Sequence, residues 1–212
     1  MKLAAIDIGS NSIKLVVVEA AASDSFAVLV RDKEVVRLGH DTLREGHLSQ
    51  SAIKRAAQSI SRFRSLAEAR GAEEVINIAT ASVREARNAS EFIEEIERQT
   101  GLRVGVLSGL EEARLIGLAA AQGCAGGSPT LLNVDIGGGS TEISLFAEGA
   151  PAELFSVRLG AVGLTEQFVT TDPIQPKELR ALKEEIRAAL ERPARKLLRG
   201  QKWRRTTGTS GT

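Results

Sequence analysis

The chain alternates between two kinds of hydrophobic spacing. Short apolar runs rich in Val and Ile are typical of strands, and stretches in which apolar residues recur every three or four positions are typical of amphipathic helices. This pattern predicts strands at 3–8, 13–19, 26–34, 75–80, 102–107, 131–135, 141–147, 153–159 and 203–207. It predicts helices at 53–67, 90–99, 109–122 and 177–199, with Pro193 kinking or breaking the last one. The stretch HDTLREGH, residues 40–47, is predicted to be a loop.

The same order of elements begins twice, which predicts two α/β domains. The first has three strands followed by helix, strand, helix, strand and helix, and it is expected to cover residues 1–123. The small, turn-prone residues 124–129 are the predicted linker. The second domain, 130–212, repeats the beginning of the pattern but has fewer elements before the glycine-rich ending TGTSGT. Either this domain is smaller, or the chain is a fragment of a longer protein.

Two segments of similar sequence mark the first hairpin of each domain. LAAIDIGSNSIKLV at 3–16 aligns with LLNVDIGGGSTEIS at 131–144. The alignment places Asp7 on Asp135, Gly9 on Gly137, Ser12 on Ser140 and Lys14 on Glu142. One such turn could be an ordinary hairpin, but two matched copies favour a shared chemical role.

That role is predicted to be phosphate binding. Successive backbone N–H groups in a small-residue turn can surround phosphate oxygens, and glycine tolerates positive φ and lets an anion approach the backbone. An aspartate at the preceding strand end is suited to hold magnesium through its waters. The candidate phosphate-binding residues are Gly9, Ser10, Asn11, Ser12, Gly137, Gly138, Gly139, Ser140 and Thr141.

Composition narrows the function classes. With 28 basic and 27 acidic residues and a net charge of +1, the chain of 212 residues has no overall field that would attract nucleic acid or a membrane surface. Its single cysteine, Cys124, rules out an internal disulfide framework and is typical of a reducing compartment. No apolar run is long enough to cross a bilayer, and the sequence lacks the GxxxxGK[ST] phosphate loop. A cytoplasmic protein is therefore expected.

Six motifs together resemble one protein family. DIGSNSIKLVV, TASVREARN, SGLEEARLI, DIGGGSTEIS, RLGAVGLTEQF and TGTSGT occur in the order found in the exopolyphosphatase and guanosine pentaphosphate phosphohydrolase (Ppx/GppA) family. The resemblance implies two ribonuclease-H-like domains of the actin, sugar kinase and Hsp70 superfamily, with a cleft between them. It also implies metal-dependent removal of terminal phosphate from polyphosphate or guanosine pentaphosphate (pppGpp), a substrate of the stringent response.

The helix start SGLEEARLI contains two neighbouring glutamates with different expected duties. Ser108 and Glu111 have the spacing of a capping box, which assigns Glu111 to the helix end and leaves Glu112 without that role. A partly desolvated carboxylate at this place could take a proton from an attacking water. The resemblance implies that Glu112 is the general base.

The resemblance assigns further roles. It implies that Arg84 and Glu142 are active-site residues, and that Asp7, Asp135 and Glu142 lie at a Mg²⁺ or Mn²⁺ site. Arg158 is a weaker candidate, and Gly163 stands where the family commonly has another arginine. Gly208, Ser210 and Gly211 are weak candidates for binding a nucleoside.

Three functional hypotheses stay open at this point. The first is the phosphohydrolase described above. The second is a kinase or ATPase of the same superfamily, and the third is a non-catalytic sensor of polyphosphate or guanosine penta- or tetraphosphate. The sequence does not decide between polyphosphate and pppGpp or between magnesium and manganese, and it leaves a homodimer open.

Overall fold

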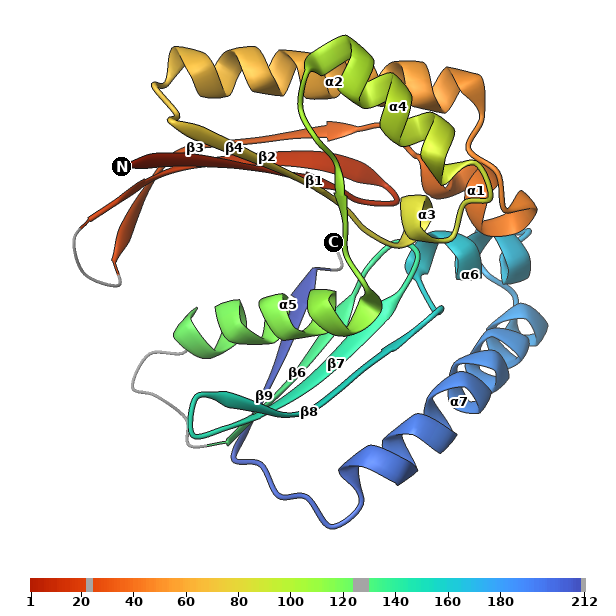
Figure 1. The fold of residues 1–212 in the computed structure, drawn as a ribbon. Coiled ribbons are helices and arrows are strands. Elements are labelled where there is room, and N and C mark those ends of the chain that lie inside the picture. Colours follow the sequence, from red (N-terminus) through yellow and green to blue (C-terminus); the bar gives the residue numbers. More distant parts are fainter. Residues whose placement is uncertain (22–24, 124–129, 211–212) are drawn as a thin grey trace. The chain divides into compact units, whose positions relative to one another are not determined.

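The chain folds into two compact α/β units, Met1–Leu107 and Ser108–Thr212 (Figure 1). The structure is a computed structural model that describes residues 1–21, 25–123 and 130–210. Within these residues, no helix is both long and apolar enough to cross a membrane.

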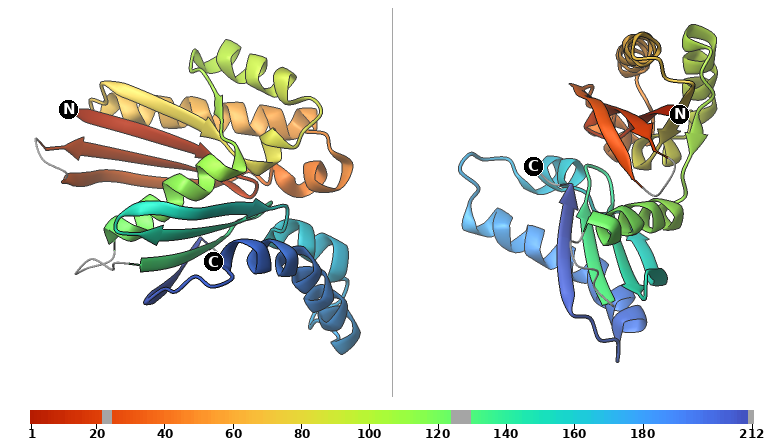
Figure 2. Two further views of the ribbon diagram at one scale, coloured as in Figure 1. Left: turned by 60° about the horizontal axis from the view of Figure 1, so that its bottom comes forward. Right: turned by 90° about the vertical axis from the view of Figure 1, so that its left-hand side faces the viewer.

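The first unit is a five-stranded sheet with helices against one face. Its elements are β1 (Lys2–Ile8), β2 (Ser12–Ala20), β3 (Phe26–Val35), α1 (Gly39–Glu45), α2 (Gln50–Ala69), β4 (Glu74–Ala79), α3 (Ala81–Arg84), α4 (Ala89–Thr100) and β5 (Gly105–Val106). The strand order is β3-β2-β1-β4-β5. Helices α2 and α4 pack against each other and lie on the same side of this sheet (Figures 1 and 2).

Alternation along the strands explains which face the helices cover. Ile6 and Ile8 of β1 and Ile13 and Leu15 of β2 point to the helix side and are almost completely buried. They join α2 residues at helical spacing, among them Phe63, in one hydrophobic core. The intervening residues of β1 and β2 face the opposite side of the sheet.

The second unit is a four-stranded sheet between two helices. Its elements are α5 (Gly109–Gly123), β6 (Thr130–Ile136), β7 (Thr141–Ala147), β8 (Ala150–Val157), α6 (Ala161–Phe168), α7 (Pro176–Leu198) and β9 (Arg205–Ser210). The strand order is β8-β7-β6-β9. One face packs against α7 through the cluster of Leu132, Ile143, Leu145 and Phe155 with Leu190 and Leu197. The other face packs against α5.

Both units wind their first four strands in the same order. In each, three consecutive strands pair antiparallel and the fourth lies parallel beside the first, as β4 does with β1 and β9 with β6. The structure therefore confirms the α/β fold class of two similarly built domains. It also confirms the internal alignment, because Asp7 pairs with Lys14 in the register in which Asp135 pairs with Glu142.

Helix α5 belongs to the second unit, whereas the sequence placed it at the end of a first domain covering 1–123. Ser144 Oγ on β7 donates a hydrogen bond to the carbonyl of Ala113, at 2.8 Å. A Cβ added to Gly117 would lie 2.4 Å from a ring carbon of Phe146, so the helix backbone lies directly on β7. Chain order alone could not reveal this packing. The predicted linker, 124–129, lies outside the described residues.

Several local predictions were wrong. Residues within HDTLREGH form helix α1 instead of a loop. The hydroxyl of Thr42 in this helix donates to the Leu38 carbonyl, and Gly46 caps its end in the left-handed conformation. Helix α6 was not predicted. Pro193 does not split α7, which is assigned as one helix. Thr207–Ser210 continues β9 because it pairs with β6, so this part of TGTSGT is a strand.

Candidate functional site

The two aligned turns have the same backbone geometry. The N–H of Gly9 donates to the carbonyl of Ser12 at 3.2 Å, and the N–H of Gly137 donates to the carbonyl of Ser140 at 2.9 Å. A Cβ would lie 3.0 Å from the Ser12 oxygen at Gly9 and 3.1 Å from the Ser140 oxygen at Gly137. Neither glycine has positive φ, which corrects the conformational reason expected from the sequence. Both positions are glycine because the backbone across the turn lies so close that a Cβ would crowd its carbonyl oxygen.

The carbonyl oxygens of both turns are held by the segment that follows the third strand. In the second unit, the N–H groups of Ala161 and Val162 donate to Gly137 and Gly138, both at 2.9 Å. In the first unit, the N–H groups of Arg37 and Gly39 donate to the turn carbonyls at 2.8 and 2.7 Å. These hydrogen bonds occupy the turn carbonyl oxygens, which would otherwise repel an anion. The turns can therefore receive phosphate oxygens at their N–H groups.

A second internal repeat accounts for these braces, and the sequence analysis missed it. The tetrapeptide Val-Arg-Leu-Gly occurs at 36–39 and again at 157–160, each time at the end of a third strand and the start of a helix. Leu38 and Leu159 are buried in the two units. A Cβ on Gly160 would lie 2.3 Å from the Gly138 carbonyl oxygen, so the helix start fits directly against the turn. A search of the sequence for repeated tetrapeptides would have found this second repeat, VRLG.

Two carboxylates lie behind the second turn. Asp135 and Glu142 are partners across β6 and β7, and their residues are 7% and 1% exposed. Partners across an antiparallel pair point to the same face. Here it is the face that packs against α5. The hydroxyl of Ser156 donates to Oε1 of Glu142 at 2.7 Å, which fixes this carboxylate in place.

Helix α5 lies over this polar face with its first turn toward Glu142. Ala113 contacts Ser144, and Gly117, one turn later, lies against Ser144 and Phe146. Residue numbers along α5 and along β7 therefore increase in the same direction. One helical turn rises about 5.4 Å and two strand residues rise about 6.8 Å, so the turn before Ala113 lies near the level of Glu142. Glu112 is in that turn and is half-buried.

The two glutamates of this turn have different surroundings. Ser108 Oγ accepts a hydrogen bond from the N–H of Glu111 at 3.2 Å, which caps the helix. The carboxylate of Glu111 is held by two hydrogen bonds from Arg114, at 2.9 and 2.7 Å, and these bonds lower its pKa. A carboxylate engaged in this way is a poor base. Glu112 is the better candidate for proton transfer.

Arg84 is anchored inside the first unit. It ends the short helix α3, its side chain is 18% exposed, and its guanidinium donates to the Leu107 carbonyl at 3.0 Å and lies 3.5 Å from Glu85. Arg87 is exposed, and its N–H donates to the carbonyl of Gly46 at 2.9 Å, which ties two loops together. Arg158 is exposed beside the brace at Leu159. The side chain of Arg84 is thus held in a fixed position within the first unit.

The end of β9 adjoins the second turn. Gly208 pairs with Val134, and Ser210 pairs with Ile136, the residue before Gly137. The side chain of Asn133 accepts from Thr207 at 2.8 Å and donates to Thr209 at 3.1 Å, which locks the two strands together. Gly211 lies outside the described residues.

Comparison with known proteins agrees with this arrangement. The Ppx/GppA phosphatase family model matches residues 15–212. The chain belongs to this family. It is 32% identical over 173 residues to exopolyphosphatase 1 of Mycobacterium leprae and 30% identical over 194 residues to that of Mycobacterium tuberculosis H37Rv. These matches cover 82% and 92% of the chain but only 51% and 56% of the relatives, so the chain spans about half of their length.

Solved structures of the Ppx/GppA family show the same fold. An exopolyphosphatase from Cytophaga hutchinsonii matches with a TM-score of 0.92 at 26% identity, covering the whole chain and 67% of that protein. An Aquifex aeolicus family member matches with a TM-score of 0.79 at 28% identity, covering the whole chain and 66% of that protein. A PilM–PilN type IV pilus complex, at 18% identity and a TM-score of 0.54, shares the fold alone.

The predicted metal ligands of this Ppx/GppA chain fall into both units. Asp135 and Glu142 are neighbours in the second unit, whereas Asp7 lies in the first. Among the described residues there is no cluster of three or more His, Cys, Asp or Glu side chains that could hold a metal. Two adjacent carboxylates nevertheless fit magnesium or manganese, which take one or two protein carboxylates and complete their shell with water and phosphate oxygens.

Proposed function

We propose that the chain carries the phosphate-binding and proton-transfer groups of a phosphohydrolase that releases terminal phosphate from polyphosphate or pppGpp. Family membership and relatives named exopolyphosphatase support this reaction class. The observation on which the proposal rests is the second unit, where a braced glycine turn, two buried carboxylates and the first turn of α5 meet on one face of a sheet.

Each group has a role in the proposed reaction. Backbone N–H groups of the Gly137–Thr141 turn bind oxygens of the phosphate chain. Arg84 keeps the role that the family resemblance implies, which is to balance the charge that spreads over the transferred group. The carboxylate of Glu112 accepts a proton from water while the water oxygen bonds to the terminal phosphorus. The bond from that phosphorus to the bridging oxygen breaks, and the shortened chain leaves with its electron pair.

Asp135 and Glu142 would hold the metal in this scheme. Mg²⁺ or Mn²⁺, when bound, supplies positive charge to the phosphate oxygens. Ser156 orients Glu142 through its hydrogen bond, and the β6–β7 register keeps Asp135 beside it. Both carboxylates are then available at one fixed place without side-chain rearrangement.

One observation favours a second function, binding without turnover. The chain spans about half the length of the curated relatives, and their activity belongs to the longer proteins. A chain that holds the turns and Glu112 could sense polyphosphate or guanosine phosphates without hydrolysing them.

The deciding experiment is phosphate release from long-chain polyphosphate and from pppGpp, with and without magnesium, for the native chain, Glu112→Gln and Glu111→Gln. Loss of a general base should lower the rate by about 10²–10⁴-fold in Glu112→Gln. Glu111→Gln is the matched control, since it removes the neighbouring charge and changes only a partly exposed pair with Arg114. Equal loss in both variants would argue against Glu112 as the base. No release by the native chain, with phosphate-chain binding intact, would support the sensor.

A further inference from the structure

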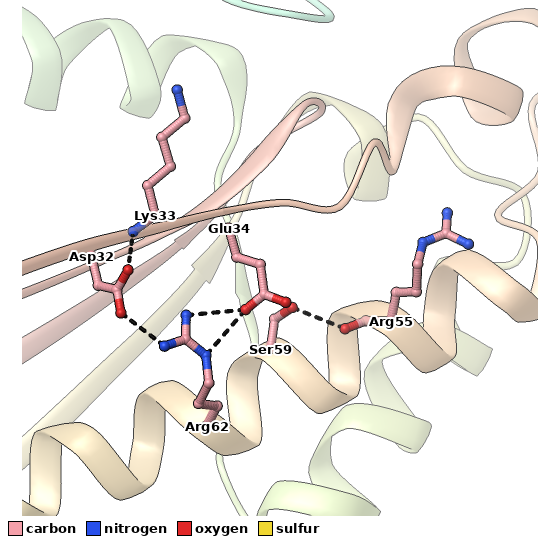
Figure 3. A network of polar contacts seen from close by, with 6 residues as sticks. All are labelled: Asp32, Lys33, Glu34, Arg55, Ser59 and Arg62. Carbon is pink, nitrogen blue, oxygen red and sulfur yellow. Dashed lines mark hydrogen bonds and ion pairs between the residues drawn. The ribbon is translucent and has the colours of Figure 1, made fainter.

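The charges of β3 are sorted between the two faces of the first sheet. Asp32 and Glu34 point to the helix side, where Arg62 of α2 binds both, at 2.9 Å and 3.1 Å (Figure 3). Lys33 points the other way in the same view, away from Arg62 (Figure 3). Alternation places Arg31 on the same face as Lys33. The acids of this strand are therefore neutralised on one side, and its bases are exposed on the other.

The exposed bases meet a third base from the next strand. Lys14 on β2 is the direct partner of Lys33, and Val16 is the partner of Arg31. Like charges directly opposite each other destabilise a sheet, and Asp7, the partner of Lys14 on β1, supplies one carboxylate to this face. Three bases against one acid leave net positive charge for an anion. A cavity of about 520 Å³ is lined by Ala5, Asp7, Lys14, Leu15, Val16, Arg31, Asp32 and Lys33. Asp32 contributes no charge to this side, because its carboxylate is turned to Arg62.

This basic face continues from the first glycine turn. Lys14 follows Ser12, the last residue of the turn, by two positions on the same face of β2. Arg31 lies directly opposite Val16, which is four residues from Ser12 along β2. Four residues of an antiparallel strand span about 13 Å. A linear anion whose end is bound at the turn would need this length to reach Arg31. A short one would end before it.

We propose that Lys33 and Arg31, beside Lys14, bind the inner phosphates of a linear polyphosphate whose end is held at the Gly9–Ser12 turn, and so give the chain a preference for long polyphosphate. The inference rests on the proposed function, because it assigns the substrate class for the same reaction. Positive charges spaced along a strand suit a repeating anion, whose phosphates are equivalent.

The test compares binding of long-chain polyphosphate and of tripolyphosphate to the full chain, with a chelator present so that neither ligand is consumed. Arg31→Gln/Lys33→Gln should weaken long-chain binding at least about tenfold and tripolyphosphate binding by a clearly smaller factor, because only Lys33 lies at the level of Lys14, within reach of the shorter anion. The dependence of log Kd on log salt should fall by about two, one for each base removed. Lys54→Gln/Arg70→Gln removes the same charge from an exposed residue of α2 and from its exposed C-cap residue. Because α2 packs on the other face, both ligands should be unaffected.

Four outcomes would overturn the proposal: equal loss for both ligands, equal loss in the control, no preference of the native chain for long polyphosphate, or equal affinity for a single-stranded RNA of matched charge. Circular dichroism melting verifies that each variant folds. The experiments distinguish rejection of this binding proposal from rejection of the proposed phosphohydrolase function. Phosphate release with unchanged chain-length preference in the β3 variant rejects this inference alone, whereas chain-length-dependent binding without release rejects only the hydrolase.

Discussion

Asp135 and Glu142 stand directly opposite each other on β6 and β7, and both are buried. The equivalent pair in the first unit is Asp7 and Lys14, which have opposite charges. Two buried carboxylates side by side repel each other unless a cation or a proton lies near them. The duplicated hairpins have thus diverged, and the second one is the better place for a divalent cation.

Glu142→Gln tests the metal assignment without relying on activity. Glutamine keeps an oxygen for the hydrogen bond from Ser156 but removes one of the two adjacent charges. The melting temperature without metal should be equal to or above that of the native chain, because a buried like-charge repulsion disappears. Added Mg²⁺ or Mn²⁺ should raise the melting temperature of the native chain, and this rise should shrink in the variant as affinity falls about 10-fold or more.

Glu185→Gln is the control for this experiment, since it removes an exposed carboxylate from α7. Its response to metal should equal that of the native chain. If Glu142→Gln is stabilised by metal as strongly as the native chain, Glu142 is not a ligand. If metal stabilises none of the proteins, the metal site does not form in this chain.

Gly160→Ala tests the brace between the start of α6 and the second turn. The new Cβ would meet the backbone of Gly138 and Gly139 at 2.3–2.4 Å, and backbone cannot yield as a flexible side chain does. We expect a loss of about 3 kcal/mol in the free energy of unfolding, at the upper end of overpacking costs, together with weaker binding of tripolyphosphate. Urea unfolding and a binding titration measure the two effects.

Gly123→Ala provides the comparison, because a Cβ there meets nothing within 4 Å. Its free energy of unfolding should change by less than about 0.5 kcal/mol. Unchanged stability and binding in Gly160→Ala would show that the turn can move aside at little cost, and the brace would then have no positioning role.

The sequence predicted the parts of this fold that depend on local pattern. Valine-rich runs separated by small-residue turns sufficed to place the paired strands, and the alignment of Asp7 with Asp135 predicted equivalent positions that the register confirms. The capping role of Ser108 also followed from local spacing. The strands and the helix cap depend on residues close together in the chain, and the alignment compares the letters of two segments without any packing between them.

The remaining features depend on packing between distant segments. Helix α5 joins the second unit because Gly117 allows it to approach Phe146, a contact that chain order does not reveal. Thr207–Ser210 becomes a strand because β6 offers its edge and Asn133 binds the two threonine hydroxyls. The short helix α1 was assigned to a loop because seven residues give too few apolar positions to show a period.

Glu178 predicts how the stability of the second unit depends on pH. Its carboxylate accepts hydrogen bonds from the hydroxyl and N–H of Thr170, from the hydroxyl of Thr171 and from the N–H of Gln175, at 2.5–2.9 Å. These bonds, led by those from the two threonine hydroxyls, lower the pKa of Glu178 from 4.5 to about 2. They tie the start of α7 to the loop after α6.

Because the folded-state pKa is lowered, the unfolded chain binds the proton more readily, and the stabilisation exists above about pH 4.5 and disappears as the pH falls toward about 2. Glu178→Gln removes the charge, so it should be less stable than the native chain at neutral pH and approach it near pH 2. Urea unfolding across this range measures the difference. Glu185→Gln, on the same helix, is the control for removal of an exposed carboxylate. A constant difference between Glu178→Gln and the native chain would mean that this carboxylate stabilises α7 equally well when protonated.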